Sequence, residues 1–304
     1  MYAIAVSAMA CLRGGTQVDV AWNLEPALTP AFDPADALAV TPGGGRLGSL
    51  LGGALDGQLV ELAGVERTKG RVVELTLGPA ESATLGLPSG SSIRSLLTPA
   101  TELPEELWPL LLDRAPVVLV ARLDGAEVER IDLFTEATVS DAGDEAVHLF
   151  GQGQSAVAVL PGAVVTVLRP RPTLVVFGSG DIPDAIGELA DYLGWATVVT
   201  NTPGDASALV ATLSALDGAV VFGHDSERTG RVLEAAVSGA VGYIGSIGPR
   251  SVREARDDWL AYRGITDLRR VRSPAGLDIG ARNPKEIAFA VIGEMIAGQT
   301  AEEP

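Results

Sequence analysis

The segment PTLVVFGSGDIPDAIGELADYLGWATVVT, residues 172–200, decides the fold of the C-terminal half of this chain. An apolar strand runs into a glycine turn at Gly178–Gly180, and the apolar positions from Ile182 to Leu193 recur at the spacing of one helical face. A second apolar strand follows at 195–200. Since a strand, a glycine turn, a helix and a strand make one βαβ unit, the segment predicts a Rossmann-like α/β fold with a parallel sheet.

The same alternation of strands and helices continues toward the C-terminus. Further strands are expected at 218–223 and 240–245, and further helices at 229–238, from about Arg250 to near Tyr262, and from Asn283 onward. Ligands of parallel sheets bind at the carboxyl ends of the strands. The glycine turn, His224 and Arg250 all lie at predicted carboxyl ends, so we expect the binding site there.

We predict two domains, a mixed α/β domain at residues 1–168 and the Rossmann-like domain at residues 169–304. A chain of 304 residues is long for one domain, and the segment RPRP at 169–172 suits a linker. The residue pair Asp124-Gly125 predicts a hairpin. The expected strands lie at 2–10, 36–41, 71–77, 117–122, 127–133, 157–160 and 163–168, and the expected helices at 56–62 and 105–112.

Composition excludes several classes of partner and site. The net charge of −17 repels phosphate backbones and anionic lipid, so we expect no nucleic acid or membrane partner. The single cysteine, Cys11, excludes an internal disulfide and a thiolate-clustered metal centre. No apolar run reaches the roughly 18 residues of a membrane span. We therefore expect a cytoplasmic protein.

The glycine turn departs from a dinucleotide-binding motif at three positions. Pro183 stands where a small residue packs the helix on the strand. Asp181, at the helix start, can cap the helix but repels a pyrophosphate. Asn201 stands where NAD enzymes place an acid for the ribose hydroxyls, and no nearby arginine is placed to favour NADP. Retained nucleotide binding and a purely structural Rossmann scaffold both stay open.

Four further features have a binding and a structural interpretation. His224 can act as a general base or shape its loop through a hydrogen bond. Arg250 can clamp a phosphate or pair with Glu254 one turn later. Asp278 can brace its loop or take part in chemistry. The stretch TPGGGRLGSLLGG at 41–53 can cradle an anion with its backbone N–H groups, or form a hairpin turn before a helix.

Six motifs occur in an order and spacing that one protein family shares. They are VTPGGGRLGSLLGG at 40–53, VFGSG at 176–180, GHD at 223–225, YIGSIGPR at 243–250, PAGLDIGA at 274–281 and NPKEIA at 283–288. Together they resemble the xanthine dehydrogenase accessory protein family (XdhC/CoxI). The resemblance spans roughly residues 36–300 and is strongest from residue 172 onward.

The resemblance implies an accessory protein that binds molybdenum cofactor, aids its sulfuration and delivers it to a xanthine dehydrogenase or CO dehydrogenase-type enzyme. It implies a molybdoenzyme catalytic subunit and a cysteine desulfurase as partners, a homodimer, and a chain without catalytic or metal-ligating residues. An NAD(P)-binding oxidoreductase and a non-catalytic scaffold are the alternatives. Glycine turns and helix starts suit the phosphate of molybdopterin. The expected cofactor-binding residues are Gly52, Gly53, Gly178, Gly180, Asn201, His224, Gly245, Gly248, Arg250 and Asp278.

The chain departs from the family pattern where the family carries thiols. The family has Gly-Gly-Cys-x-Glu where this chain reads GGALD at 52–56, and Cys-Gly-Gly where it reads SGS at 89–91. Asp181 replaces a histidine, and NTP at 201–203 replaces Asp-Pro-Arg. The two missing thiols are the soft ligands that a molybdenum–sulfur centre prefers. We infer a divergent member with altered ligand binding.

Overall fold

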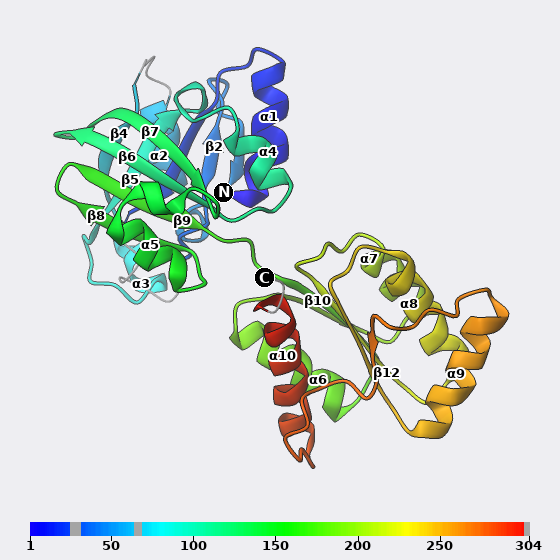
Figure 1. The fold of residues 1–304 in the computed structure, drawn as a ribbon. Coiled ribbons are helices and arrows are strands. Elements are labelled where there is room, and N and C mark those ends of the chain that lie inside the picture. Colours follow the sequence, from blue (N-terminus) through cyan, green and yellow to red (C-terminus); the bar gives the residue numbers. More distant parts are fainter. Residues whose placement is uncertain (25–31, 64–68, 301–304) are drawn as a thin grey trace. The chain divides into compact units, whose positions relative to one another are not determined.

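The computed structural model describes residues 1–24, 32–63 and 69–300 of the chain. The chain forms two compact units, Met1–Pro170 and Arg171–Pro304 (Figure 1). The division falls inside the proline- and arginine-rich segment 169–172, at whose start the predicted domain boundary lies.

Antiparallel strands dominate the N-terminal unit. In its described part, nine strands hydrogen-bond in the order β3-β2-β1-β5-β4-β7-β6-β9-β8. The strands are Asp19–Asn23 (β1), Leu38–Val40 (β2), Arg46–Gly48 (β3), Arg71–Thr76 (β4), Ser92–Pro99 (β5), Val117–Asp124 (β6), Glu127–Thr135 (β7), Ala156–Leu160 (β8) and Ala163–Leu168 (β9). The helices are Ala5–Arg13 (α1), Asp56–Ala63 (α2), Pro79–Thr84 (α3), Leu107–Leu112 (α4) and Asp144–Gly151 (α5).

The predicted strand at 2–10 is wrong. A 3-10 turn at Tyr2–Ile4 leads directly into α1, which packs against α4 and buries Ala5 and Ala8. A short apolar run fits a buried strand and a buried helix equally well, and the alanines of this run favour the helix. The hairpin prediction at Asp124-Gly125 is confirmed, because β6 and β7 pair across this turn and Gly125 has a φ of 58°.

A tryptophan at the centre of the N-terminal unit joins two distant strands of its sheet. Trp22 on β1 is 1% exposed, and its Nε1 donates a hydrogen bond of 3.1 Å to Oγ1 of Thr166 on β9. Apolar residues of α1, α4, β5 and β6 pack in the same core. The core of this unit therefore depends on contacts between segments far apart in the sequence.

The C-terminal unit contains a parallel sheet. In the described part of the unit, five strands pair in the order β11-β10-β12-β13-β14, and every pair is parallel. The strands are Thr173–Phe177 (β10), Ala196–Thr200 (β11), Gly218–Phe222 (β12), Tyr243–Ile247 (β13) and Val271–Arg272 (β14). The helices are Asp181–Tyr192 (α6), Pro203–Val210 (α7), Ser226–Ser238 (α8), Arg250–Tyr262 (α9) and Pro284–Thr300 (α10). The predicted Rossmann-like parallel fold is confirmed.

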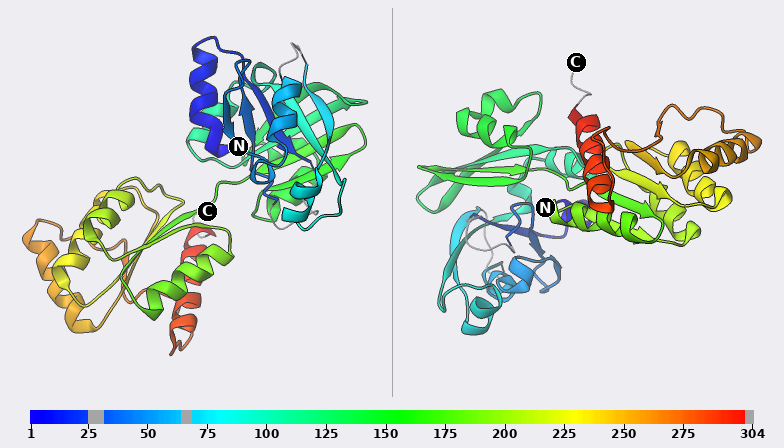
Figure 2. Two further views of the ribbon diagram at one scale, coloured as in Figure 1. Left: turned by 180° about the vertical axis from the view of Figure 1, so that it is seen from behind. Right: turned by 90° about the horizontal axis from the view of Figure 1, so that it is seen from below.

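Helices cover both faces of this sheet. Helices α6 and α10 lie side by side on one face, where they appear light green and red (Figure 2). Helices α7, α8 and α9 pack on the other face. The last helix begins as expected, because Asn283 Oδ1 accepts the backbone N–H of Glu286 at 3.0 Å. The predicted cap by Asp181 is wrong, since Asp181 is the first residue of α6 and no side chain caps that helix.

The strand order determines where a ligand can enter the sheet. Numbered by occurrence in this unit, the order is 2-1-3-4-5, which is the order of flavodoxin-like sheets. The chain leaves β10 toward β11 on one side and later returns to β12 on the other. In such sheets the binding crevice opens at this reversal, beyond the carboxyl ends of the strands.

Candidate functional site

A pocket of about 360 Å³ opens at the reversal point between β10 and β12. We call it the switch-point pocket. Loops after β10, β11 and β12 form it together with the first turn of α8. Its volume lies near the lower end of the roughly 300–1,000 Å³ that small-molecule sites occupy. Its lining residues are Phe177, Gly178, Ser179, Asn201, Phe222, Gly223, His224, Asp225, Arg228 and Thr229.

The two glycines of the β10 turn have different roles. Gly178 has a φ of 145°, and a Cβ there would lie 2.8 Å from the carbonyl oxygen of Phe222. Gly178 is therefore required by the close approach of the β10 and β12 loops. Gly180 has a φ of 100°, and a Cβ there would meet no described atom within 4 Å. The backbone in front of α6 is thus open to a ligand at Gly180.

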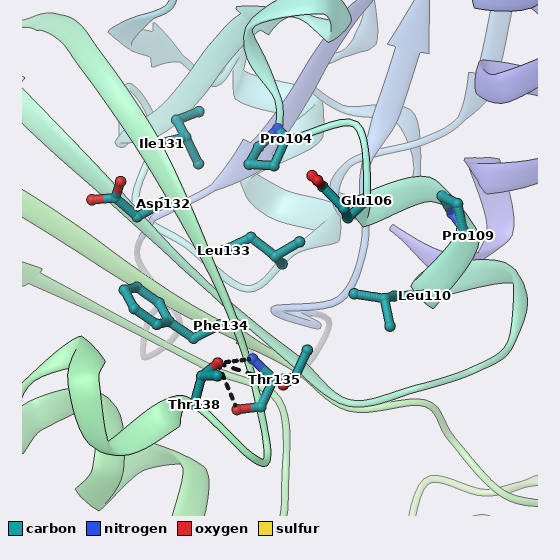
Figure 3. A pocket seen from close by; sticks show the side chains of 10 residues that line it. All are labelled: Pro104, Glu106, Pro109, Leu110, Ile131, Asp132, Leu133, Phe134, Thr135 and Thr138. Carbon is teal, nitrogen blue, oxygen red and sulfur yellow. Dashed lines mark hydrogen bonds between the residues drawn. The ribbon is translucent and has the colours of Figure 1, made fainter.

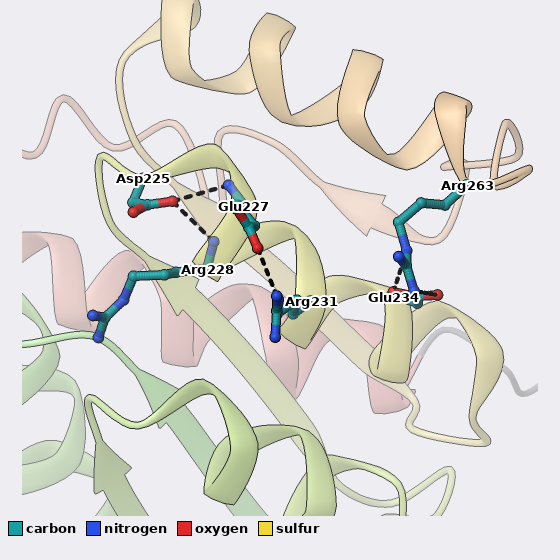
Figure 4. Close-up of polar contacts among 6 residues, drawn as sticks. All are labelled: Asp225, Glu227, Arg228, Arg231, Glu234 and Arg263. Carbon is teal, nitrogen blue, oxygen red and sulfur yellow. Dashed lines mark hydrogen bonds and ion pairs between the residues drawn. The ribbon is translucent and has the colours of Figure 1, made fainter.

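Arg228 spans the switch-point pocket from α8 to the end of β11. Its Nη2 donates to the carbonyl oxygen of Asn201 at 2.5 Å and to Asn201 Oδ1 at 3.2 Å. Asp225 fixes the first turn of α8 by accepting the backbone N–H groups of Glu227 and Arg228, each at 3.0 Å (Figure 4). A guanidinium has five N–H donors. The N–H groups on Nε and Nη1 of Arg228 bond to no described residue, so they are available to bind a ligand.

The sequence analysis found no arginine near Asn201 that could favour NADP. This prediction is wrong. Arg228 is 27 residues from Asn201 along the chain, and the crossover through α7 and β12 brings the two together. The helix predicted to start at residue 229 begins at Ser226, with Asp225 as its N-cap. Asp225 was the available signal, because an N-cap aspartate predicts that the following residues form the first helical turn.

His224 lies at the carboxyl end of β12, as expected, but its ring has no polar partner in the described part of the chain. The ring is exposed and stands edge-on to Phe222, with 6.2 Å between the ring centroids. A general base needs a second group to orient it, and none is present here. The hydrogen bond expected to shape the loop is also absent among the described residues.

Other predicted residues lie outside the switch-point pocket. Arg250 pairs with Glu254 at 2.8 Å, and both side chains are exposed, so the surface-pair interpretation is confirmed. A Cβ on Gly248 would lie 3.3 Å from the Gly223 carbonyl oxygen, beside the pocket wall. A Cβ on Gly245 would lie 2.9 Å from the Tyr243 ring, which makes Gly245 a packing position.

The last of these predicted residues, Asp278, lies exposed in the loop before α10. Its carboxylate makes no hydrogen bond or ion pair with a described residue, so the bracing role expected for it is not found.

The glycine-rich segment of the N-terminal unit begins as a hairpin turn. Strands β2 and β3 pair across it, and Thr41 N–H donates to the Gly45 carbonyl oxygen at 3.0 Å. Gly52 and Gly53 follow in a 3-10 turn and line a second pocket of about 360 Å³ together with Leu51, Ala54, Ala80, Glu81, Thr84 and Leu85. The lining carries an acid and no cation, so it does not favour an anion.

A larger groove of about 820 Å³ lies between the start of α4 and β7 (Figure 3). Its lining is mostly apolar, and Glu106 and Asp132 are its charged residues. Asp132 pairs with Arg130 at 3.1 Å, and Thr135 and Thr138 hydrogen-bond to each other. The lining of the groove contains no histidine, cysteine, lysine or arginine. The switch-point pocket contains a histidine and an arginine, so we favour the C-terminal unit as the location of the functional site.

Metal and membrane sites find no support in the described residues. No group of three or more histidine, cysteine, aspartate or glutamate side chains there could hold a metal ion. Cys11 lies half-buried on α1 against the N-terminal core. No helix in the described ranges is both long enough and apolar enough to cross a bilayer.

Two of the motifs that carry the family resemblance are joined through one partly buried side chain. Glu294 Oε2 on α10 accepts the hydroxyl of Tyr243 at 2.7 Å and the N–H of Gly276 at 2.8 Å. Burial raises the pKa of Tyr243 well above its ordinary value, and the hydrogen bond to Glu294 adds to the rise. These motifs therefore stabilise the fold, and Glu294 is a structural residue that the sequence analysis missed.

The comparison with protein families agrees with the Rossmann-like fold of the C-terminal unit. Residues 174–295 match the family model of the XdhC Rossmann domain. The C-terminal unit therefore contains a domain that is similar to the XdhC Rossmann domain. The resemblance inferred from the sequence motifs, to accessory proteins of xanthine dehydrogenase, is confirmed. The matched range contains every residue that lines the switch-point pocket of the XdhC domain.

A comparison with solved structures finds a weak similarity over the whole chain. A xanthine dehydrogenase from Bacillus halodurans, known from a crystal structure, is 19% identical, and the similarity covers 98% of this chain and 96% of that chain with a TM-score of 0.43. No curated protein matches the chain.

Proposed function

We propose that this protein is an accessory protein of a xanthine dehydrogenase-type molybdoenzyme, and that its XdhC domain binds a molybdopterin form in the switch-point pocket. The family match over residues 174–295 carries the proposal, because it includes the whole lining of that pocket. Delivery of the cofactor implies docking on the catalytic subunit of the molybdoenzyme. A cysteine desulfurase as second partner and a homodimer belong to the same proposal.

The pocket suits the phosphate end of such a ligand. Arg228 offers free guanidinium N–H groups, which bind phosphate through charge-assisted hydrogen bonds. The open backbone at Gly180 leads into α6, whose N-terminal N–H groups favour an anion. Phe222 and His224 offer ring surfaces to a flat pterin. Asp181 in the first turn of α6 opposes a pyrophosphate, so the proposal favours the monophosphate form over the dinucleotide.

The pocket offers no soft ligand to the metal end. The two thiols of the family pattern are absent, and the one cysteine lies in the other unit. Molybdenum would therefore be held through the dithiolene that the pterin itself supplies. The chain's own part is to bind the phosphate and cover the ring.

The proposal predicts that a molybdopterin form co-purifies with the protein and raises its melting temperature. Replacing Arg228 by Ala should weaken binding roughly ten- to hundredfold, because hydrogen bonds to a charged group contribute about 1.5–3 kcal/mol. Fluorescence of the oxidised pterin released from the protein and a thermal shift assay measure the two effects. Arg231→Ala is the matched control, since Arg231 lies one turn later on α8 and pairs with Glu227 at 2.6 Å.

Two outcomes would count against this function. Absence of a pterin from the purified protein, together with no thermal shift on adding molybdopterin, favours a non-catalytic scaffold. Equal affinity in the wild type and the Arg228→Ala variant would remove the switch-point pocket as the site. An oxidoreductase is the less supported alternative, because His224 has no orienting partner in the described structure.

A further inference from the structure

We propose that the switch-point pocket also binds a ribose that carries a 2′-phosphate, as in NADP-type nucleotides, and that Arg228 selects this group. The inference rests on the same pocket as the proposed function but not on its pterin ligand. It assigns a second class of ligand and a residue that determines specificity.

The first support comes from the position of Asn201. It directly follows β11, the second strand of the βαβ unit, where NAD enzymes place an acid that binds the ribose hydroxyls. An acid there repels a 2′-phosphate. The amide of Asn201 carries no charge, so this chain lacks the group that excludes NADP-type nucleotides.

The second support is the placement of Arg228. Two hydrogen bonds from Nη2 to Asn201 hold the guanidinium at the end of β11, where the 2′-phosphate of such a nucleotide lies. The N–H groups on Nε and Nη1 make no hydrogen bond with any described residue. Because the guanidinium is already oriented, a phosphate that binds it loses little conformational freedom of the protein.

The third support is the charge around Arg228. On the same face of the unit, Arg231 pairs with Glu227 at 2.6 Å, and Arg263 pairs with Glu234 at 2.8 Å (Figure 4). Asp225, which lines the pocket, accepts backbone N–H groups and does not pair with the Arg228 side chain. Arg228 therefore keeps its positive charge unpaired by the described acids, although the chain carries a net charge of −17.

The size and charge of the pocket restrict which part of the nucleotide is recognised. A volume of about 360 Å³ suits one nucleotide rather than a complete dinucleotide. Asp181 and Asp184 lie in the first turn of α6, where a pyrophosphate would bind. Recognition therefore depends on the adenosine 2′-phosphate half. The chain binds the nucleotide without transferring hydride.

Two isomers of one nucleotide provide the test. Adenosine 2′-monophosphate and adenosine 5′-monophosphate have the same atoms and charge and differ only in where the phosphate is attached. We expect the full-length protein to bind the 2′ isomer roughly ten- to hundredfold more tightly by calorimetry. Arg228→Gln should abolish the preference, and Arg231→Gln should keep it. Melting temperatures without ligand verify that both variants are folded.

Several results would overturn the inference. Equal affinities for the two isomers, no binding of either, or a preference that persists in Arg228→Gln would each do so. Molybdopterin binding measured on the same samples keeps the two proposals distinct. If molybdopterin binds and neither isomer does, only this inference fails. If the 2′ isomer binds selectively and molybdopterin does not, only the proposed function fails. If both bind, the 2′ isomer should displace molybdopterin.

Discussion

Replacing Asp217 by Ala should lower the free energy of unfolding of the C-terminal unit by about 3–5 kcal/mol. Asp217 is 1% exposed and lies directly before β12. Its Oδ1 accepts the N–H of Thr173 at 2.7 Å, and its Oδ2 accepts the N–H and the hydroxyl of Ser214, both at 2.8 Å. Truncation leaves these donors without their acceptor, and each such loss costs about 1–3 kcal/mol.

The loss should be visible in β10, because Thr173 is the first residue of that strand. Hydrogen exchange of the full-length protein in increasing urea, resolved by peptide, measures the stability of β10 separately from the N-terminal unit. Asp217→Asn is the matched control, since its amide keeps the shape and one acceptor oxygen, and it should lose less. An Ala variant whose β10 exchanges like the wild type would show that Asp217 is not needed to hold the start of this strand.

Trp22→Ala should destabilise the N-terminal unit by about 3–5 kcal/mol. The indole is 1% exposed within the main core of that unit, and its hydrogen bond to Thr166 links β1 with β9. Removing the ring leaves a large cavity and an unpaired hydroxyl. Hydrogen exchange of peptides from β1 and β9 measures the effect without interference from the C-terminal unit.

A second pair of variants separates the volume of the indole from its hydrogen bond. Trp22→Phe keeps an aromatic ring but leaves the Thr166 hydroxyl without its partner, so we expect a loss of about 1–3 kcal/mol. Adding Thr166→Val removes that hydroxyl and should recover part of the loss, since replacing both partners by apolar groups is nearly neutral. If the double variant is no more stable than Trp22→Phe, the hydrogen bond does not contribute as we infer.

The fold could be predicted from the sequence where the residues that define an element lie close together in the chain. The βαβ unit at 172–200 could be predicted because one strand, one glycine turn and one amphipathic helix lie next to each other in the chain. The strand expected at 2–10 failed because an apolar run carries no periodicity that separates a buried strand from a buried helix. Strands β1 and β5 were missed because their burial depends on partners far away in the sequence.

The site was predicted only in part for a topological reason. Carboxyl ends of parallel strands share one edge of the sheet, and the predicted residues Gly178, Asn201 and His224 at this edge line the switch-point pocket. No local sequence motif predicts the order of the strands along that edge. The sheet places the end of β13 beyond β12, away from β11, so Arg250 lies outside the pocket. Arg228 reaches Asn201 only through a crossover that the sequence does not display.

The contact of Glu294 with Tyr243 and Gly276 has a consequence for how this protein evolves. It holds β13 and the loop before α10 without using any residue of the switch-point pocket. Arg228 and Asn201, in contrast, meet at the protein surface, where substitutions usually change stability little. Mutations can therefore alter ligand preference while the motifs that identify the lineage persist. This freedom is limited to positions such as Arg228 and Asn201, which lie outside the six motifs, because the motifs at 176–180 and 223–225 line the pocket themselves.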